Sequence, residues 1–324
     1  MSESRETTVP KGRSFKMNSI FQNDRYKSIL AIICAVGWSL AYPLIKVGYS
    51  RFEITADDMG GKLLFAGIRF LLAGVLVSLF CIFRGKRLSA KRKSDISWLL
   101  LLAIVNTTLH YMFAYIGLSN NSSGRSTILD SMNGFFLIFL SAFFFKDDRL
   151  NTRKLIGCIM GLIGIVLINI DPNGGFFDNI SFRGDGMILI NALCGAFGGI
   201  ITRIVSRKTD IISATGYSMT IGGALLVLLS ICTGIKSPWN IQLSGILVMF
   251  ILVLISAVCF AIYNKLLSYH PISEIAIYNA LIPVLGVIFA SVILNEQFKW
   301  QYFVSVFLVA VGIRIVNTRC TLID

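Results

Sequence analysis

The chain has 324 residues, of which 55% are hydrophobic and 15% charged, and its formal net charge is +13. Soluble domains carry about one quarter charged residues, and no stretch of this chain after residue 27 is polar enough to form a soluble surface. The composition therefore argues against a soluble protein and predicts an all-α integral membrane protein.

Residues 1–27 form a polar segment that carries six Lys and Arg residues. The segment is too long and its charges too scattered for the start of a signal peptide. The apolar run that follows is long for a signal peptide and lacks a small-residue cleavage site. We therefore expect residues 1–27 to be a polar cytoplasmic tail and the apolar run to be retained as the first helix.

Ten apolar segments of about 20 residues follow the tail, and this is the length that an α-helix needs to cross about 30 Å of hydrocarbon. The segments are predicted at residues 28–50, 60–83, 96–118, 125–145, 153–170, 184–205, 213–235, 242–266, 273–294 and 299–317. The connections between them are short, and none is long enough to hold an inserted soluble domain.

The distribution of Lys and Arg predicts the orientation of these segments. If the N-terminus is placed inside, the inner tails and loops receive 22 of the 30 Lys and Arg residues and the outer loops receive six. This bias follows the positive-inside rule and predicts a multi-pass protein of the cell membrane with both termini in the cytoplasm. Because the positive charges then face anionic lipid, we expect the bilayer and no nucleic acid as the partner of this basic chain.

The ten segments divide into two units of five, at residues 28–170 and 184–317. Short matches recur in the same order in both units at an offset of 147 to 149 residues, for example Phe113-Ala114 with Phe260-Ala261. Because five is an odd number, the second unit enters the membrane from the opposite side. We therefore expect ten transmembrane helices arranged as two inverted repeats around a central cavity, as in many transporters.

Several segments carry a resemblance to a known family. They are Trp38-Ser-Leu-Ala-Tyr-Pro-Leu-Ile-Lys46, Gly67-Ile-Arg-Phe-Leu-Leu-Ala73, Tyr115-Ile-Gly-Leu118, Asp148-x-Leu150 and Gly157-x-x-x-Gly161-x-x-Gly164. The chain resembles the EamA-type ten-helix permeases of the drug/metabolite transporter superfamily over essentially residues 28–317, although Asp148 stands where that family often has Glu. The resemblance implies a bundle of two inverted five-helix repeats that moves small metabolites by alternating access.

Ionisable residues inside apolar segments are the first candidates for substrate binding, because such residues are costly in a bilayer and usually face a cavity or a partner. Arg69 lies in the second segment, His110 in the third and Asp130 in the fourth. Arg69 would bind a carboxylate, and Asp130 an amine or a coupling proton. The alternatives are a structural Arg69–Asp130 ion pair and a neutral His110 that is hydrogen-bonded to a neighbouring helix.

Aromatic and amide side chains form a second group of candidates. Trp38 and Tyr42 share one face of the first segment, and Asn133 follows the acid of the fourth segment by three residues on the same face. Tyr278 and Asn279 lie in the inner half of the ninth segment. For aromatic residues near the end of a segment, the alternative is a role as interface anchors.

The sequence has no motif of an enzyme or of a nucleotide-driven pump. It contains only two histidines, no H-E-x-x-H, no Walker A motif and no C-x-x-C pair. We therefore expect no cofactor and no metal site, and we predict a secondary transporter of a small polar metabolite, such as an amino acid, across the plasma membrane. The alternatives are a membrane-embedded enzyme that acts on lipid intermediates and a multidrug or nucleoside exporter of the same fold. Proton or ion coupling and the oligomeric state stay open.

Overall fold

The computed structural model describes residues 20–85, 93–121, 123–169, 181–237, 239–295 and 301–317. Within these ranges the chain is helical and carries eight helical segments that are long and apolar enough to cross a membrane. They are Asp24–Arg51, Met59–Phe83, Asp95–Ser119, Arg125–Phe144, Phe182–Ser206, Ile211–Thr233, Leu243–Tyr269 and Ile272–Leu294. The protein is therefore a multi-pass membrane protein. Residues 1–19 of the predicted tail lie outside the described ranges.

Five long helices are continuous: α2 (Asp24–Arg51), α3 (Met59–Phe83), α9 (Met187–Ser206), α10 (Ile211–Thr233) and α11 (Leu243–Tyr269). Polar side chains cap the starts of three of them by accepting a backbone N–H that no helical carbonyl can satisfy. Asn23 caps α2, Asp58 caps α3 and Asp210 caps α10. The cap at Asn23 explains why the first helix begins inside the segment predicted to be a polar tail.

Two shorter helices, α8 (Thr152–Asn169) and α14 (Gln301–Asn317), have 18 and 17 residues and occupy the fifth and tenth predicted segments. The other segments are interrupted. The third consists of α4 (Lys93–Ala103), a π-helical turn η1 (Ile104–Leu109) and α5 (His110–Ser119); the fourth of α6 (Ser123–Asp130) and α7 (Met132–Phe144); and the ninth of α12 (Ile272–Ala276), the 3-10 turn η4 (Ile277–Ala280) and α13 (Leu281–Leu294). A second π-helical turn, η3 (Phe182–Gly186), precedes α9.

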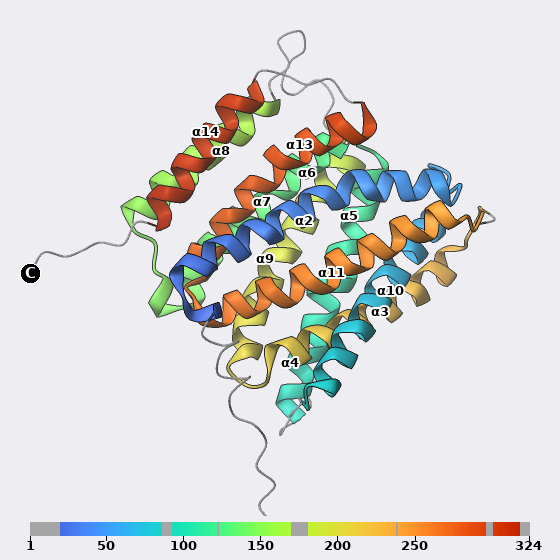
Figure 1. Cartoon of the computed structure of the whole chain (residues 1–324), viewed down its shortest axis with the longest axis horizontal. Coiled ribbons are helices and arrows are strands. Elements are labelled where there is room, and N and C mark those ends of the chain that lie inside the picture. Colours follow the sequence, from blue (N-terminus) through green and yellow to red (C-terminus); the bar gives the residue numbers. More distant parts are fainter. Residues whose placement is uncertain are drawn as a thin grey trace, which may run out of the picture.

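The helices pack in pairs that join the two halves of the chain. Figure 1 shows α8 beside α14 on one flank and α3 beside α10 on the other, with α2, α11 and α13 between them. Helix α2 packs on both α11 and α13, and α9 packs on both α5 and α7. Every one of these pairs takes one member from each half, so the bundle depends on contacts between the halves.

Small residues allow α3 and α10 to approach closely. A Cβ atom on Gly74 would lie 2.3 Å from the backbone nitrogen of Thr220, and one on Gly67 would lie 2.7 Å from a methyl carbon of Val227. Because the partner number falls as the number on α3 rises, the two helices are antiparallel. Without a hydrophobic effect to drive association in lipid, such close van der Waals packing is a main source of stability.

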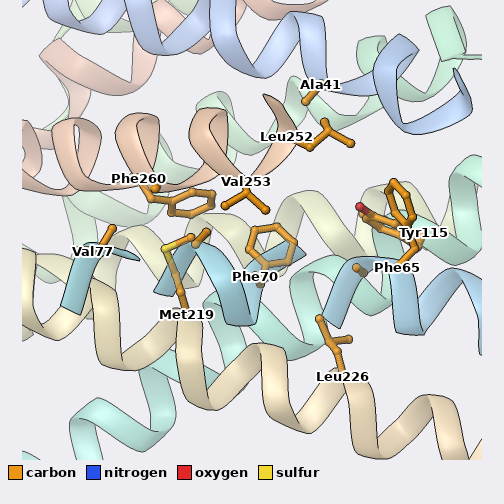
Figure 2. Packing of buried hydrophobic residues seen from close by; sticks show 14 of the residues in the cluster. Ala41, Phe65, Phe70, Val77, Tyr115, Met219, Leu226, Leu252, Val253 and Phe260 are labelled. Carbon is orange, nitrogen blue, oxygen red and sulfur yellow. The ribbon is translucent and has the colours of Figure 1, made fainter. Parts of the chain in front are cut away.

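Large apolar side chains fill the space where α3, α10 and α11 meet. Figure 2 shows Phe70 of α3 close to Val253 and Phe260 of α11, with Met219 and Leu226 of α10 below it in this view. Phe70 is fully buried. This packing fixes α3 against α11 and so holds Arg69, the neighbour of Phe70, at a constant depth in the bundle.

Candidate functional site

A cavity lies inside the bundle, with about 830 Å³ of space when its opening is included. Seven of the eight predicted binding residues line it: Trp38, Tyr42, Arg69, His110, Asp130, Asn133 and Asn279. Tyr278 does not line the cavity. Its hydroxyl instead donates to the Ser28 hydroxyl at 2.7 Å. Tyr278 and Asn279 are neighbours in a helical turn, so their side chains point to different sides of it.

Arg69 is the positive pole of the cavity. Its side chain is almost completely buried, its Nε donates to the Ser256 hydroxyl at 2.7 Å, and its Nη1 lies 3.4 Å from the Tyr115 hydroxyl. The guanidinium also lies 5.0 Å from the ring centre of Phe70. All of these partners are neutral, so the charge of Arg69 meets no carboxylate within the described part of the chain.

Asp130 is the negative pole, and it lies at the end of α6 where the fourth segment is interrupted. Asn191 of α9 donates from Nδ2 to its carboxylate, and the Tyr42 hydroxyl lies close to the same group. Arg69 and Asp130 do not form an ion pair with each other. The alternative of a self-satisfied structural pair therefore does not describe this site, and each charge faces the cavity with neutral partners.

His110, the first residue of α5, connects to the same hydrogen-bond network. Its Nδ1 lies 2.9 Å from the backbone carbonyl oxygen of Asn191. Because a carbonyl oxygen can only accept, Nδ1 carries the hydrogen, and Nε2 is left to accept a proton or a hydrogen bond. Asn191 thus contacts both His110, through its backbone carbonyl, and Asp130, through its side chain, and so links the positions of these two residues.

Two interrupted helices, one from each half of the chain, bring polar residues to the cavity. Asp130 ends α6, and Asn279 lies in the 3-10 turn η4. Pro283 explains the second interruption, because it has no N–H to donate to the carbonyl four residues earlier, which is that of Asn279. Discontinuous helices at corresponding positions of two halves are a frequent feature of transporter binding sites.

Aromatic rings form much of the remaining wall. Trp38 packs edge-on against Tyr263 and Phe260, with ring centres 4.9 and 5.6 Å apart. Its indole Nε1 is buried and makes no hydrogen bond within the described residues. The wall thus offers apolar ring surface and one unused donor next to the two charged poles.

The sequence reasoning missed several members of the site. The additional polar and aromatic residues that line the cavity are Asn106, Tyr111, Tyr115, Phe260, Tyr263 and Asn264. Asn191 and Ser256, which hold the two charged poles, were also missed. Each of these residues could have been noticed only as a polar or aromatic residue within an apolar segment, because the direction in which its side chain faces depends on how the helices pack.

Ion pairs lie beyond the cavity near both ends of α2. Near its start, Lys27 contacts Glu274 of α12 at 2.6 Å and Asp24 at 3.3 Å. Toward its other end, Lys46 donates to the backbone of Asn121, whose side chain donates to Asp185. Arg125 binds this same Asp185 through two hydrogen bonds of 2.7 and 2.9 Å.

Asp24, His270 and Glu274 are close enough together to hold a metal ion. The ammonium group of Lys27 already contacts both of these acids, so it supplies the positive charge that the cluster requires. The geometry of this cluster is that of an ion-pair network between α2 and α12.

The sequence model of the EamA-like transporter family matches residues 26–170 and again residues 182–318. The chain belongs to the EamA-like transporter family. Both halves of the bundle described above are thus copies of one family domain, and the protein is a transporter of the drug/metabolite superfamily and not an enzyme.

Curated relatives agree with this assignment. The chain is 27% identical over 297 residues to the uncharacterized transporter YvbV of Bacillus subtilis, covering 90% of this chain and 92% of the relative. It is 24% identical over 301 residues to a probable amino-acid metabolite efflux pump of Escherichia coli, covering 90% and 94%. A protein of known crystal structure with 16% identity superposes with a TM-score of 0.72 over 91% of this chain and 98% of the other, which shows a shared fold.

Proposed function

We propose that this member of the EamA-like transporter family is a secondary transporter that moves a small zwitterionic metabolite, such as an amino acid, across the plasma membrane. The observation that carries the proposal is the pair of opposite charges in one cavity. Arg69 and Asp130 both line the cavity, and neither contacts an oppositely charged partner. An α-amino acid brings a carboxylate for Arg69 and an ammonium group for Asp130.

The other candidate substrates match the cavity less well. A nucleoside has no pair of opposite charges, and a cationic drug would leave the buried Arg69 without a counter-charge. A buried charge that stays unpaired is costly, so a substrate that neutralises both poles is favoured over one that neutralises a single pole. The naming of two relatives as probable amino-acid metabolite efflux pumps supports the same choice.

Alternating access in this proposal depends on ten spans and on inverted repeats. We infer that α8 and α14 also cross the bilayer and that both termini are cytoplasmic. The main helix pairs support a two-fold relation between the halves, because these pairs are kept when each helix is exchanged for its counterpart in the other half. Under this exchange the pairs α3–α10 and α8–α14 stay the same pairs. The pair α2–α11 becomes α9–α5, and the pair α2–α13 becomes α9–α7. The antiparallel contact of α3 with α10 is what an axis in the membrane plane requires.

Counterflow in proteoliposomes tests the proposed substrate class. Vesicles are loaded with one unlabelled amino acid of a panel and should then accumulate the labelled form of the same amino acid. They should not accumulate the labelled amine, which lacks the carboxylate, or the labelled N-acetyl amino acid, which lacks the positive charge. The variant Tyr278→Phe serves as a control because its ring lies outside the cavity. Equal accumulation of the amine and the amino acid, or accumulation of a nucleoside alone, would contradict the proposal. A matched series with and without a pH gradient reports proton coupling.

A further inference from the structure

A second hollow lies on the outside of the bundle between α3 and α11, which run side by side along one flank in Figure 1. We call it the α3–α11 groove. It holds about 1160 Å³ of space, and all ten side chains that line it are apolar, six from α3 and four from α11. Met249 and Val253 form a buried floor, while Leu79 and Phe250 form exposed walls. Because both helices are apolar spans, the groove faces the hydrocarbon of the bilayer.

The α3 wall of the groove matches one leaflet of a bilayer in length. Its residues on α3 extend from Leu72 to Phe83, and eleven residue steps along a helix cover roughly 16 Å. The hydrocarbon core of a bilayer is about 30 Å thick, so one leaflet contributes about 15 Å. A fatty-acyl chain of one leaflet can therefore lie along the α3 wall, from Phe83 at the headgroup region to Leu72 near the membrane midplane.

A positive charge marks the headgroup end of the groove. Arg84 follows the last residue of α3, is exposed, and places its guanidinium 5.1 Å from the ring centre of Phe80, which lines the groove. No carboxylate pairs with Arg84 in the part of the chain that the structure describes. The sequence continues with Lys86 and Arg87. Arginine binds phosphate groups through two parallel hydrogen bonds, and each basic residue at a membrane surface favours anionic lipid.

We propose that the α3–α11 groove binds an anionic phospholipid of the surrounding bilayer. The acyl chain lies along the α3 wall from Phe83 to Leu72, and the headgroup phosphate meets Arg84. The charge of Arg84 distinguishes an anionic lipid from a zwitterionic one, while the apolar lining distinguishes a phospholipid from a soluble phosphate compound. This inference is independent of the substrate proposed for the central cavity.

Native mass spectrometry of the full chain in detergent tests the inference, with phosphatidylglycerol and phosphatidylcholine of identical acyl chains added in equal amounts. Wild type should retain phosphatidylglycerol in preference. Arg84→Gln should reduce that retention about fivefold, the effect of one basic residue at a membrane surface. Arg149→Gln removes an exposed charge just before α8, on the flank opposite α3 (Figure 1), and should change nothing. Leu76→Phe, which narrows the groove, should reduce retention of both lipids.

Three outcomes would overturn the inference. Equal retention of the two lipids by wild type would exclude a role of charge, and equal losses in Arg84→Gln and Arg149→Gln would show that the effect is not specific to Arg84. A dimer that Leu76→Phe abolishes would assign the groove to a second copy of the chain. Melting curves of each variant show that a lost lipid does not reflect a lost fold, because the substituted side chains are exposed.

Discussion

Asp130 is the single acid among the described residues that line the cavity. In the variant Asp130→Asn the shape of the side chain is kept while its charge is lost. A hydrogen bond to a charged group contributes about 1.5–3 kcal/mol, so we expect kcat/KM for transport to fall about 10-fold to 100-fold with a nearly unchanged melting temperature. Uptake in proteoliposomes measures the effect. Normal transport with an unchanged pH profile in the well-folded variant would exclude a role for Asp130 in binding or coupling.

Arg69 should behave in a complementary way. In Arg69→Lys the positive charge remains, but the donor to Ser256 and the planar contact with Phe70 are lost. We expect a raised KM for substrates with a carboxylate, while the fold is retained. Ser256→Ala, which removes the partner and keeps the charge, should raise KM less. If Arg69→Lys transports like wild type, the geometry of the guanidinium is irrelevant to binding.

His270 follows the last residue of α11, outside the spans, and gives the protein a pH-dependent stability. Burial lowers the pKa of His270 below its ordinary value of 6.5, and the nearby charge of Lys27 adds to this, against the opposing effects of the Phe21 carbonyl, Glu274 and Asp24. The unfolded chain then binds a proton at a higher pH than the folded chain does. Stability is therefore complete above about pH 6.5 and falls as the pH decreases toward the folded pKa.

Melting temperatures of wild type and His270→Gln between pH 7.5 and pH 5 test this expectation. The wild-type melting temperature should fall more steeply with acidification than that of the variant, since glutamine does not titrate. Arg203 donates to the backbone carbonyl of His270 and keeps this contact in both proteins. Parallel curves would show that His270 does not carry the pH dependence.

Which residues reach the cavity was partly predictable from sequence. Charged residues inside apolar segments, such as Arg69 and Asp130, are costly in a bilayer and so point to an interior position whatever the packing. The facing of Tyr278 was not predictable, because it depends on the tight turn at Ile277–Ala280. Asn191 and Ser256 act on residues from the other half of the chain, and such partners appear only when the halves are placed together.

The close packing of α3 and α10 gives a prediction at the level of helices. Gly74→Leu should destabilise the protein by about 1–3 kcal/mol, the usual cost of inserting bulk into a packed interface. Gly74→Ala should cost less. Leu228→Phe adds bulk at an exposed position of α10 and serves as the control. Thermal unfolding in one detergent compares the three variants, and equal stability of Gly74→Leu and wild type would contradict the packing described here.

The Lys27–Glu274 ion pair joins α2 to α12 beyond one end of the cavity. Lys27 is buried, so removal of one partner leaves a charge with reduced solvation. We expect Lys27→Glu and Glu274→Lys each to lower the melting temperature and the transport rate, and the double exchange to restore both in part. The exposed pair Lys236–Asp57 is the matched control, because exposed pairs contribute little. A double exchange no better than the single variants would exclude a pairwise interaction.

The helices themselves were predicted well, and their irregularities were not. Apolar runs of about 20 residues fix the length of a helix, so α3 and α10 begin and end within about two residues of the expected bounds. Pro283 is a sequence signal for the irregularity of the ninth segment, because the structure has a 3-10 turn where the hydrogen bond that proline cannot donate would have been. The π-helical turn at Ile104–Leu109 has no comparable sequence signal. A π-helical turn contains one residue more than an α-helical turn, and no residue type marks where that extra residue is inserted.

The arrangement of the whole molecule leads to a prediction about symmetry. Superposing α2 through α8 on η3 through α14 should require a rotation near 180° about an axis in the membrane plane. The comparison requires an experimental structure in a bilayer that defines the membrane normal. A rotation axis along that normal would show parallel repeats in place of inverted ones.

Orientation in the membrane can be tested with a membrane-impermeant thiol reagent on intact cells. We expect Cys320 to be protected until the cells are permeabilised, because the positive-inside bias places the C-terminus in the cytoplasm. Lys236 is exposed and lies just beyond the end of α10, on the side that the same bias places outside the cell. The cysteine of a Lys236→Cys variant should therefore react without permeabilisation. The reverse pattern would overturn the proposed topology. The experiment uses a background in which Cys232, the exposed cysteine of the described chain, is replaced.

The two charged poles of the cavity come from the first half of the chain, and their hydrogen-bond partners Asn191 and Ser256 come from the second. At the offset of 147 to 149 residues, Arg69 corresponds to a residue of Gly216–Ser218 and Asp130 to one of Ile277–Asn279, and all of these residues are uncharged. A protein assembled from two first halves would therefore enclose four charges in one cavity, and one assembled from two second halves would enclose none at these positions. The two copies of the family domain therefore differ in the charges that they bring to the cavity, and we expect that neither copy can replace the other. A gene for a single unit, acting as a symmetric dimer, could not have held this combination of groups.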